Sequence, residues 1–519
     1  MLILSMKPGH DGSIAAIENG NLLFSLESEK DSFPRYDRVT PSLAILAFKK
    51  MPRMPDCIAI SGWIKGVHPT DTPLESGYFG WESSNCSISD ELFMGKKLKK
   101  FTSSHERSHI MCAYGMSPYP QGKPVYCLVW EGTLGDFYEI DENVNIKHLG
   151  KVLTDPGNKY SSLYMIADKN FPEIKGFLRH EDAGKLMALT AYSKRDGLDK
   201  DEQSLISRIL DIKEPITNID KTDYKNSIFY NIGVESDKFK NLSGKFSDEL
   251  FNRFFNFAKD NLRKGYPLLI SGGCGLNCDW NSAWRESGLF EDVFVPPCAN
   301  DTGSAIGTAI DANFHISGNA KINWNVYSGD EFITDQIDND YFVEDTFSTD
   351  NVARFLSEGN IIAWVQGKCE IGPRALGNRS ILAAPFLKSM TERLNKIKNR
   401  EGFRPIAPIC LAEEAERLFG CKTPSPYMLY FYKVQDENLK AITHVDGSAR
   451  IQTVTNADNE KTYNLLKSFK ELTGYGVLCN TSLNFNGKGF INRFSDLYKY
   501  CKSRNLDGFV IGDKFYKKK

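Results

Sequence analysis

The sequence predicts an α/β protein whose N-terminal part is duplicated. An apolar run at residues 2–6 meets a glycine turn and is followed by a hairpin pattern at 13–27. Residues 125–152 repeat this strand-and-hairpin pattern. A further buried strand, at 268–277, ends in a glycine-rich turn. Two β-meanders separated by helical sequence therefore predict two related sheets.

Actin-like and sugar-kinase-like ATPases are built as such a duplication, with the turns of both halves facing a nucleotide. The chain of 519 residues is also longer than one hydrophobic core usually organises. Residues 316–350 are rich in Asp, Asn and Ser, and a new strand is expected at 361–365. We therefore expect an actin-like domain at 1–340 and a second α/β domain at 350–519.

Composition narrows the classes of protein to which the chain can belong. Hydrophobic residues make up 41% and charged residues 25%, which is typical of a folded soluble enzyme. No apolar stretch approaches the ~20 residues that span a bilayer, and the net charge of -2 gives no general attraction to nucleic acid or anionic membranes. Twelve cysteines without a C-x-x-C pair, and an N-terminus without a signal-peptide pattern, predict reduced thiols and a cytoplasmic location.

Glycine-rich turns after predicted strands are candidates for a nucleotide site. Glycine has no Cβ, so a phosphate can approach its backbone, and the free amides at a helix start attract an anion. A small-residue helix is expected directly after the second such turn, at 296–307. The residues predicted to contact the nucleotide in these turns are Gly132, Gly135, Gly272, Gly273, Asn277 and Gly303.

A metal site is predicted from two histidines one helical turn apart. His105 and His109 are spaced i, i+4, so both imidazoles would face the same side of a helix. Asp301, in a glycine turn after a strand, is a candidate third ligand. Such a set suits iron, zinc or manganese. The alternative is an ordinary pair of surface or core histidines.

The first turn carries a candidate catalytic pair, His10 and Asp11. Both lie where the first strand ends, and a side chain there can reach a ligand without disturbing the sheet. His10 could deprotonate a hydroxyl group. The alternative is a histidine that caps its own loop.

The C-terminal domain contains the densest polar segments. Residues 372–380 place two arginines in a glycine-bounded loop, and 398–405 add three cations beside Phe403 and Pro405, which favours a packed anion site over solvated charge. Two more segments set polar groups beside strands, although ordinary turn and cap residues would look the same. The candidate binding residues are Arg374, Arg379, Lys398, Arg400, Arg404, His444, Arg450, Asn480, Ser482 and Asn484.

At these residues the sequence resembles the O-carbamoyltransferases that act in nodulation-factor, tobramycin and hydroxymethylcephem biosynthesis. The segments 7–13 and 26–35 are most similar to the hydroxymethylcephem branch, and Gly12 stands where the wider family usually has serine. The resemblance adds Lys185 to the nucleotide site. Other family-like blocks are 105–109, 184–189, 271–277, 300–307, 372–380, 400–408, 444–450 and 480–484.

The resemblance implies a fold and a reaction. The N-terminal domain would be similar to the tRNA threonylcarbamoyltransferase subunit. The C-terminal domain would be similar to threonylcarbamoyl-adenylate synthases, whose K-x-R and S-x-N signatures match Lys398 with Arg400 and Ser482 with Asn484. Carbamoyl phosphate and ATP with Mg²⁺ would form carbamoyl adenylate there. The N-terminal domain would then pass the carbamoyl group to an acceptor hydroxyl, with the metal fixing a nucleotide phosphate.

Three functions remain open from the sequence. The acceptor could be the hydroxymethyl group of a small, cephem-like metabolite. A Lys-, Asn- and Ile-rich composition, unlike that of typical cephem producers, leaves room for a hydroxymethylated pyrimidine such as 5-hydroxymethylcytosine, in a nucleotide or in DNA. The net charge of -2 does not favour DNA. A regulatory actin-like ATPase without transferase activity is the third function, and the oligomeric state is open.

Overall fold

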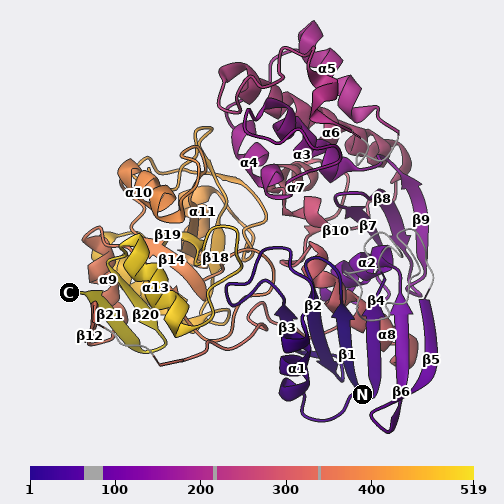
Figure 1. Ribbon diagram of the computed structural model, residues 1–519, viewed down its shortest axis with the longest axis horizontal. Helices are drawn as coiled ribbons and strands as arrows, with labels where there is room; N and C mark the ends of the chain where they lie inside the picture. The colour runs from indigo at the N-terminus through magenta and orange to yellow at the C-terminus, as the bar shows by residue number, and fades with distance from the viewer. Residues whose placement is uncertain (63–85, 214–218, 337–339) are drawn as a thin grey trace. The chain divides into compact units, whose positions relative to one another are not determined.

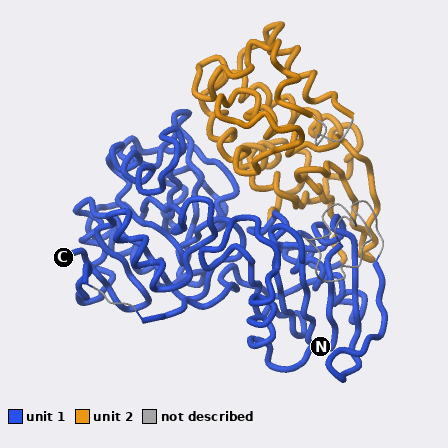
Figure 2. Tube along the Cα trace, in the orientation of Figure 1, with its two compact units in different colours: residues 1–121, 296–519 blue, residues 122–295 orange. Residues whose placement is uncertain are grey.

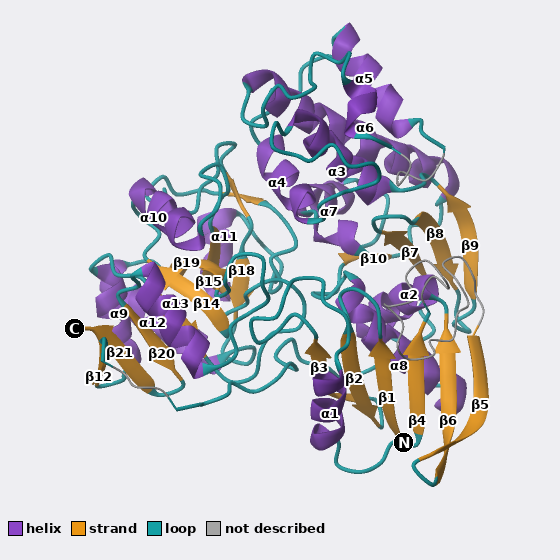
Figure 3. Cartoon of the chain, in the orientation of Figure 1, coloured by secondary structure: helices purple, strands orange, loops and turns teal. Residues whose placement is uncertain are grey.

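The computed structural model describes residues 1–62, 86–213, 219–336 and 340–519. It is a mixed α/β fold, as predicted (Figure 3). The chain forms two compact units, of which unit 1 contains residues 1–121 and 296–519 and unit 2 contains residues 122–295 (Figure 2). Unit 1 is therefore discontinuous in sequence.

The first sheet of unit 1 has the strand order β3-β2-β1-β4-β6-β5 (Figure 1). Helix α8 packs across β1, β2 and β4. On the other side of β1, Leu4 and Met6 join a buried apolar cluster with Ala47 of α1. The strands are β1 (Leu2–Lys7), β2 (Ser13–Glu18), β3 (Asn21–Glu27), β4 (Cys57–Ser61), β5 (Cys86–Phe93) and β6 (Lys96–Ser103). The helices are α1 (Pro41–Lys50), α2 (His105–Met116), the short η4 (Asp301–Gly303) and α8 (Ser304–Ser317).

The sheet of unit 2 repeats the first sheet in order and direction. Its order, read from the far edge, is β9-β8-β7-β10-β11, which matches β3-β2-β1-β4-β6. In both sets of five, the first three strands are antiparallel and the other two run parallel to the third, while the first sheet has β5 in addition, antiparallel to β6. The two meanders in the sequence thus predicted a real duplication. The strands are β7 (Val125–Trp130), β8 (Gly135–Ile140), β9 (Ile146–Lys151), β10 (Leu268–Ser271) and β11 (Val293–Phe294).

Helices form the rest of unit 2. The longest, α6, packs against α3, α4 and α5. Its sequence places Phe246, Leu250 and Phe254 on one buried face at helical spacing. The helices are α3 (Pro156–Ala167), α4 (Glu181–Thr190), α5 (Lys200–Leu210), η2 (Lys221–Tyr224), α6 (Asp237–Asn261), η3 (Gly273–Leu276) and α7 (Cys278–Glu286).

The C-terminal part of unit 1 is a mixed sheet in the order β12-β21-β20-β13-β14-β19-β15-β18. Alternate residues of β13 enter different clusters, since Ala363 and Val365 lie in one and Ile362 and Trp364 in the other. The sheet is therefore covered on both faces. The strands are β12 (Phe342–Asp345), β13 (Ile362–Val365), β14 (Arg379–Ala383), β15 (Ala407–Leu411), β18 (Gln452–Val454), β19 (Val477–Ser482), β20 (Gly508–Ile511) and β21 (Lys514–Lys518), with a separate pair β16 (Tyr432–Lys433) and β17 (Ser448–Ala449). The helices are α9 (Thr349–Ser357), α10 (Lys388–Lys398), η5 (Ala412–Glu414), α11 (Ala415–Phe419), α12 (Glu460–Thr473) and α13 (Phe494–Arg504).

The predicted domain boundary lies within unit 1. Part of the predicted connection, residues 337–339, is outside the described residues. The C-terminal sheet already includes β12, which precedes the strand expected at 361–365. The division into domains 1–340 and 350–519 stays a prediction. Among the described residues, no helix combines the length and apolar character needed to cross a bilayer.

Candidate active site

The three predicted metal ligands lie together in unit 1. Helix α2 begins at His105, after a cap in which the Ser104 side chain accepts the backbone N–H of Arg107, and His109 follows one turn later. Both histidines are buried. Asp301, in the turn before α8, has Oδ1 3.3 Å from His109 Nε2 and 3.7 Å from His105 Nε2. The two Nε2 atoms are 3.3 Å apart.

These separations fit one shared metal ion. Ligands bonded at ~2.1 Å lie roughly 3.0–3.4 Å apart in tetrahedral or octahedral coordination. The three ligand atoms lie within 4.8 Å of one another, and all three residues are buried. The imidazole rings meet edge to face, at an interplanar angle of 89°. His105, His109 and Asp301 could therefore hold a metal, which would supply positive charge for a phosphate oxygen.

A buried lysine balances the charge of Asp301. Lys7, which is fully buried at the end of β1, has its Nζ 3.0 Å from Asp301 Oδ2. Burial acts to raise the pKa of Asp301, but the charge of Lys7 and the neighbouring His105 and His10 side chains hold this pKa well below its usual value. Asp301 is thus ionised, with Oδ2 directed to Lys7 and Oδ1 to the histidines.

The predicted catalytic pair adjoins this cluster. His10 Nδ1 lies 3.0 Å from Asp11 Oδ2, and His10 Nε2 lies 3.7 Å from Asp301 Oδ2. Asp11 has a positive φ of 51°, a conformation that aspartate tolerates, and the Asn300 amide donates to its Oδ1 at 3.4 Å. The His10 side chain is 43% exposed, so an acceptor from solvent can reach it.

Loss of one histidine is expected to empty the metal site. In His109→Ala one of three ligands is gone, and removal of a ligand should lower the metal content of purified protein by at least ~10-fold. Elemental analysis per mole of folded protein measures this, and His180→Ala, at an exposed histidine before α4, serves as the control. Equal metal content in both variants would show that the two histidines are packing residues and not metal ligands.

The predicted nucleotide turns of unit 2 are compact. Gly272 has a φ of 98°, and a Cβ on it would lie 2.4 Å from the Trp130 carbonyl oxygen, so only glycine fits there. A Cβ on Gly135 would lie 2.6 Å from the Leu153 oxygen, and one on Gly132 3.2 Å from Asn158. A Cβ on Gly273 would meet nothing within 4 Å, so its backbone is open to a ligand.

Three other predicted nucleotide residues have structural partners. The Asn277 side chain caps α7 by accepting the backbone N–H groups of Asp279 and Trp280. Lys185 Nζ lies 2.9 Å from Asp182 within α4. A Cβ on Gly303, in unit 1, would lie 2.2 Å from the Cys298 oxygen, so close packing requires that glycine. Contact of these residues with a nucleotide stays a prediction.

The structure brings the K-x-R and S-x-N signatures together. Lys398, the last residue of α10, donates from Nζ to the Ser482 oxygen at 2.5 Å and to Asn484 Oδ1 at 2.6 Å. The Ser482 hydroxyl donates to the same Asn484 oxygen. Burial, followed by the surrounding positive charges, holds the pKa of Lys398 well below its usual value. Those charges come from Arg400, Arg404, Arg504 and Arg35.

Cations therefore gather around Lys398 with few carboxylates. Burial and the charges of Arg404 and Arg450 lower the pKa of Arg400 to about 9. Glu401 lies 3.7 Å from Arg404, and Glu29 lies 3.2 Å from Arg35. Desolvation is the larger cause of this shift, and the nearby positive charges add to it. We call Lys398, Arg400, Arg404, Arg450, Arg504 and Arg35 the cationic cluster.

Arg379 has a structural role instead. Its guanidinium is fully buried and donates to three backbone oxygens, of Gln366, Gly367 and Asn378, and twice to Asn492 Oδ1. All five N–H donors of an arginine are thereby engaged. Arg379 shapes the loop, and we leave it out of the proposed anion site.

The loop that carries Arg374 is held from both sides. Glu370 accepts the backbone N–H groups of Leu376, Asn378 and Arg379. At the other end, the Gly372 N–H donates to Glu27 and the Gly372 carbonyl accepts from Lys30 at 2.7 Å. Glu27 and Lys30 lie at and after the end of β3, so the N-terminal sheet positions this loop.

The remaining predicted residues of the C-terminal part lie in strands and turns. Asn480, in β19, donates to the Ala375 carbonyl and to Gln452, while its own Oδ1 is buried without a hydrogen-bond partner in the described chain. The His444 carbonyl accepts from Gly447 in a tight turn that precedes β17.

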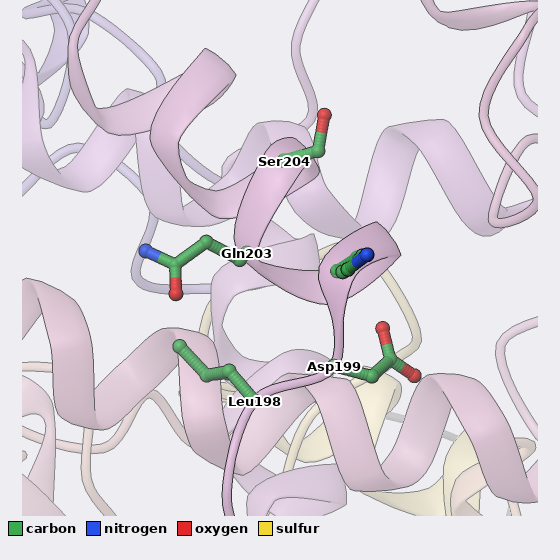
Figure 4. Close-up of a pocket in the computed structure, with 5 residues that line it drawn as sticks. Leu198, Asp199, Gln203 and Ser204 are labelled. Carbon is green, nitrogen blue, oxygen red and sulfur yellow. The ribbon is translucent and has the colours of Figure 1, made fainter.

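Local sequence patterns do not identify six further charged residues of these sites: Lys7, Glu27, Lys30, Arg35, Glu370 and Arg504. The segment 26–35 resembles the hydroxymethylcephem branch, but no local signal assigns its charged residues to a site. The pocket drawn in Figure 4 lies elsewhere. It is lined by Leu198, Asp199, Lys200, Gln203 and Ser204 at the start of α5, and it contains no predicted site residue.

Two family models match the chain. The model described as "Carbamoyltransferase N-terminus" matches residues 88–310, and the model described as "Carbamoyltransferase C-terminus" matches residues 353–518. Together they cover most of the sequence. The chain belongs to the carbamoyltransferase family, so the predictions of that family and of a carbamoyltransferase enzyme are confirmed.

The chain aligns with curated relatives over nearly their whole length. The chain is 46% identical to a 3'-hydroxymethylcephem-O-carbamoyltransferase of Amycolatopsis lactamdurans and 45% identical to that of Streptomyces clavuligerus, covering 100% of this chain and 99% of each relative. It is 32% identical to nodulation protein U of Bradyrhizobium diazoefficiens, over 97% of this chain and 95% of that protein. The predicted likeness to the hydroxymethylcephem branch is therefore confirmed.

Solved structures are only distantly similar. The 2-hydroxyisocaproyl-CoA dehydratase activator of Clostridium difficile matches with a TM-score of 0.36 and 12% identity, over 61% of this chain and 96% of that one. Full-length HypF matches with a TM-score of 0.32 and 14% identity, over 62% of this chain and 56% of that one. Likeness at this level adds no argument about function.

Proposed function

We propose that the chain is an ATP-dependent O-carbamoyltransferase that makes carbamoyl adenylate in its C-terminal part and delivers the carbamoyl group to an acceptor hydroxymethyl group. The cationic cluster is the observation that carries this proposal. Buried Lys398 and half-buried Arg400 have few carboxylates nearby, and the negative charge of carbamoyl phosphate and of the ATP phosphates would balance theirs. The C-terminal domain would then be similar to threonylcarbamoyl-adenylate synthases in function as well as in its signatures.

The amide N–H groups of a carbamoyl group also need hydrogen-bond acceptors in the site. The buried Asn480 Oδ1 is an acceptor, and Asn480 lies on the same face of β19 as Ser482, because the two are separated by one residue. Both hydrogen bonds from its Nδ2 fix which amide atom is the oxygen. A carbamoyl N–H would pair with this oxygen, which supports a carbamoyl donor over a plain phosphate.

Transfer to the acceptor would take place at the His10 cluster. Asp11, 3.0 Å from His10 Nδ1, would keep the proton on that nitrogen. The Nε2 lone pair would then accept the hydroxyl proton of the acceptor. His105, His109 and Asp301 would hold the metal, and the glycine turns, with Lys185, would contact the nucleotide as in actin-like ATPases.

A small hydroxymethyl acceptor is favoured over DNA. The two most similar relatives named above are called hydroxymethylcephem carbamoyltransferases, and the net charge is -2. Non-specific DNA binding depends mainly on phosphate neutralisation.

The proposal is tested by measuring pyrophosphate release and acceptor carbamoylation on the same protein sample. Labelled carbamoyl phosphate and ATP should give pyrophosphate release without acceptor, and carbamoylation of a hydroxymethyl cephem with it. Hydroxymethylcytosine, as nucleotide and as DNA, is the parallel acceptor. Pyrophosphate release that does not depend on carbamoyl phosphate would contradict the adenylate step, and carbamoylation of DNA alone would reverse the choice of acceptor.

A further inference from the structure

Unit 1 contains a second group of connected polar side chains, which are not among the proposed carbamoyl-transfer residues. Cys86, at the start of β5, has its Sγ 3.2 Å from Nε2 of His315 on α8. His315 Nδ1 lies 3.2 Å from Asp311 Oδ1 and 3.0 Å from the Asp311 carbonyl oxygen. Thiol, imidazole and carboxylate are thus connected in series, the order in which a base is oriented toward a nucleophile.

A guanidinium adds positive charge at the same place. Arg107 of α2 donates to both carboxylate oxygens of Asp311, at 2.6 and 2.8 Å, and is close enough to Cys86 for the two to interact electrostatically. Asp311 is fully buried and the His315 side chain is 30% exposed. The hydrogen bond to Asp311, and then that to Cys86, raises the pKa of His315 to about 10. At neutral pH Cys86 therefore faces an imidazolium and a guanidinium, with Asp311 as their counter-ion.

Cys86 differs from the other cysteines in exposure. Each of the other eleven cysteines is buried, while Cys86 is partly exposed. Burial raises the pKa of several of them, including Cys57, to about 12 in that case. Reactive cysteines are those that combine partial exposure with nearby positive charge, because the thiolate is the nucleophile. In this chain only Cys86 has both.

We propose that Cys86 is a reactive thiolate and the site at which hydroperoxides oxidise this protein. The sulfur attacks one peroxide oxygen, the O–O bond breaks, and sulfur becomes a sulfenic acid while the peroxide is reduced. The leaving hydroxide, or the alkoxide of an organic hydroperoxide, takes the proton of the His315 imidazolium and departs as water or as the alcohol. This reaction uses neither carbamoyl phosphate nor ATP, so it stands independently of the proposed function.

Alkylation of the native protein tests the thiolate. Iodoacetamide should label one cysteine per chain, found at Cys86 by peptide mass spectrometry, and at about pH 6 the rate should remain high. An ordinary thiol of pKa about 8.5 is only about 0.3% ionised there. His315→Gln should slow alkylation at this pH about 10- to 20-fold, because the positive charge that favours the thiolate beside Cys86 is removed.

A matched control distinguishes the effect of His315 on Cys86 from the effect of removing any histidine. His148→Gln removes a histidine that lies 2.9 Å from Asp136 and has no cysteine beside it, so the Cys86 rate should not change. After hydrogen peroxide, a cyclic 1,3-dione that traps sulfenic acid should label wild type and not Cys86→Ser. An alkylation profile that follows an ordinary thiol and is unchanged in His315→Gln would overturn the proposal. Trapping at another cysteine would do the same.

Discussion

Replacing Arg400 with alanine is expected to lower the rate of carbamoyl-phosphate-dependent pyrophosphate release about 10²-fold. Arg400 is a half-buried member of the cationic cluster, and one charge-assisted hydrogen bond contributes ~1.5–3 kcal/mol. Its guanidinium also donates to Asn395 and to the Pro405 carbonyl, so the local loop could shift with it. Arg450→Ala provides a second test, because the buried Arg450 Nε has no hydrogen-bond partner in the described chain.

Arg393→Ala is the matched control for this prediction. Arg393 lies on the same helix, α10, but is 41% exposed and is neutralised by Asp507 at 2.6 Å. Its loss should leave pyrophosphate release within about twofold of wild type, since exposed ion pairs contribute little. Wild-type release in both Arg400→Ala and Arg450→Ala would remove the cationic cluster from the donor site.

In His10→Asn, transfer to the acceptor is expected to fall ~10²–10⁴-fold while pyrophosphate release continues. Asparagine retains a hydrogen-bonding group of similar reach but cannot take up the hydroxyl proton. The carbamoyl adenylate would then form and hydrolyse without reaching the acceptor. Measuring pyrophosphate and carbamoylated acceptor in the same reaction gives the ratio that defines the defect.

Asn300→Ala is a useful companion to His10→Asn. Asn300 donates to Asp11 at 3.4 Å, and its amide cannot act as a base, so only a small loss of transfer is expected there. If pyrophosphate release and transfer fall equally in His10→Asn, His10 helps to build the nucleotide site. If neither falls, it only caps its turn.

Local sequence patterns predicted the duplicated sheets and the histidine pair, because both depend on residues close together in the sequence. The β-meanders gave the duplicated sheets, because hairpins are set by turn residues and alternation. The i, i+4 spacing placed His105 and His109 on one side of α2. The two signatures around Lys398 and Ser482 meet in the structure, although only the resemblance paired them in advance.

Contacts between distant segments could not be predicted in this way. Arg35 and Lys398 act on each other across the first sheet and the C-terminal part, and Cys86 and His315 are 229 residues apart. No pattern in the sequence marks such pairs. Arg379 was predicted to bind an anion, but in the structure it donates to backbone oxygens. The sequence of a glycine-bounded loop does not show whether its arginine binds a ligand or the backbone.

The discontinuity of unit 1 affects how the chain folds during its synthesis. Strand β1 leaves the ribosome well before α8, which packs on it and begins only at Ser304. At ~5–20 residues per second this interval is about 15–60 s. Unit 2 is continuous and can fold within it. The apolar face of the first sheet that α8 covers therefore remains exposed on the nascent chain throughout this interval.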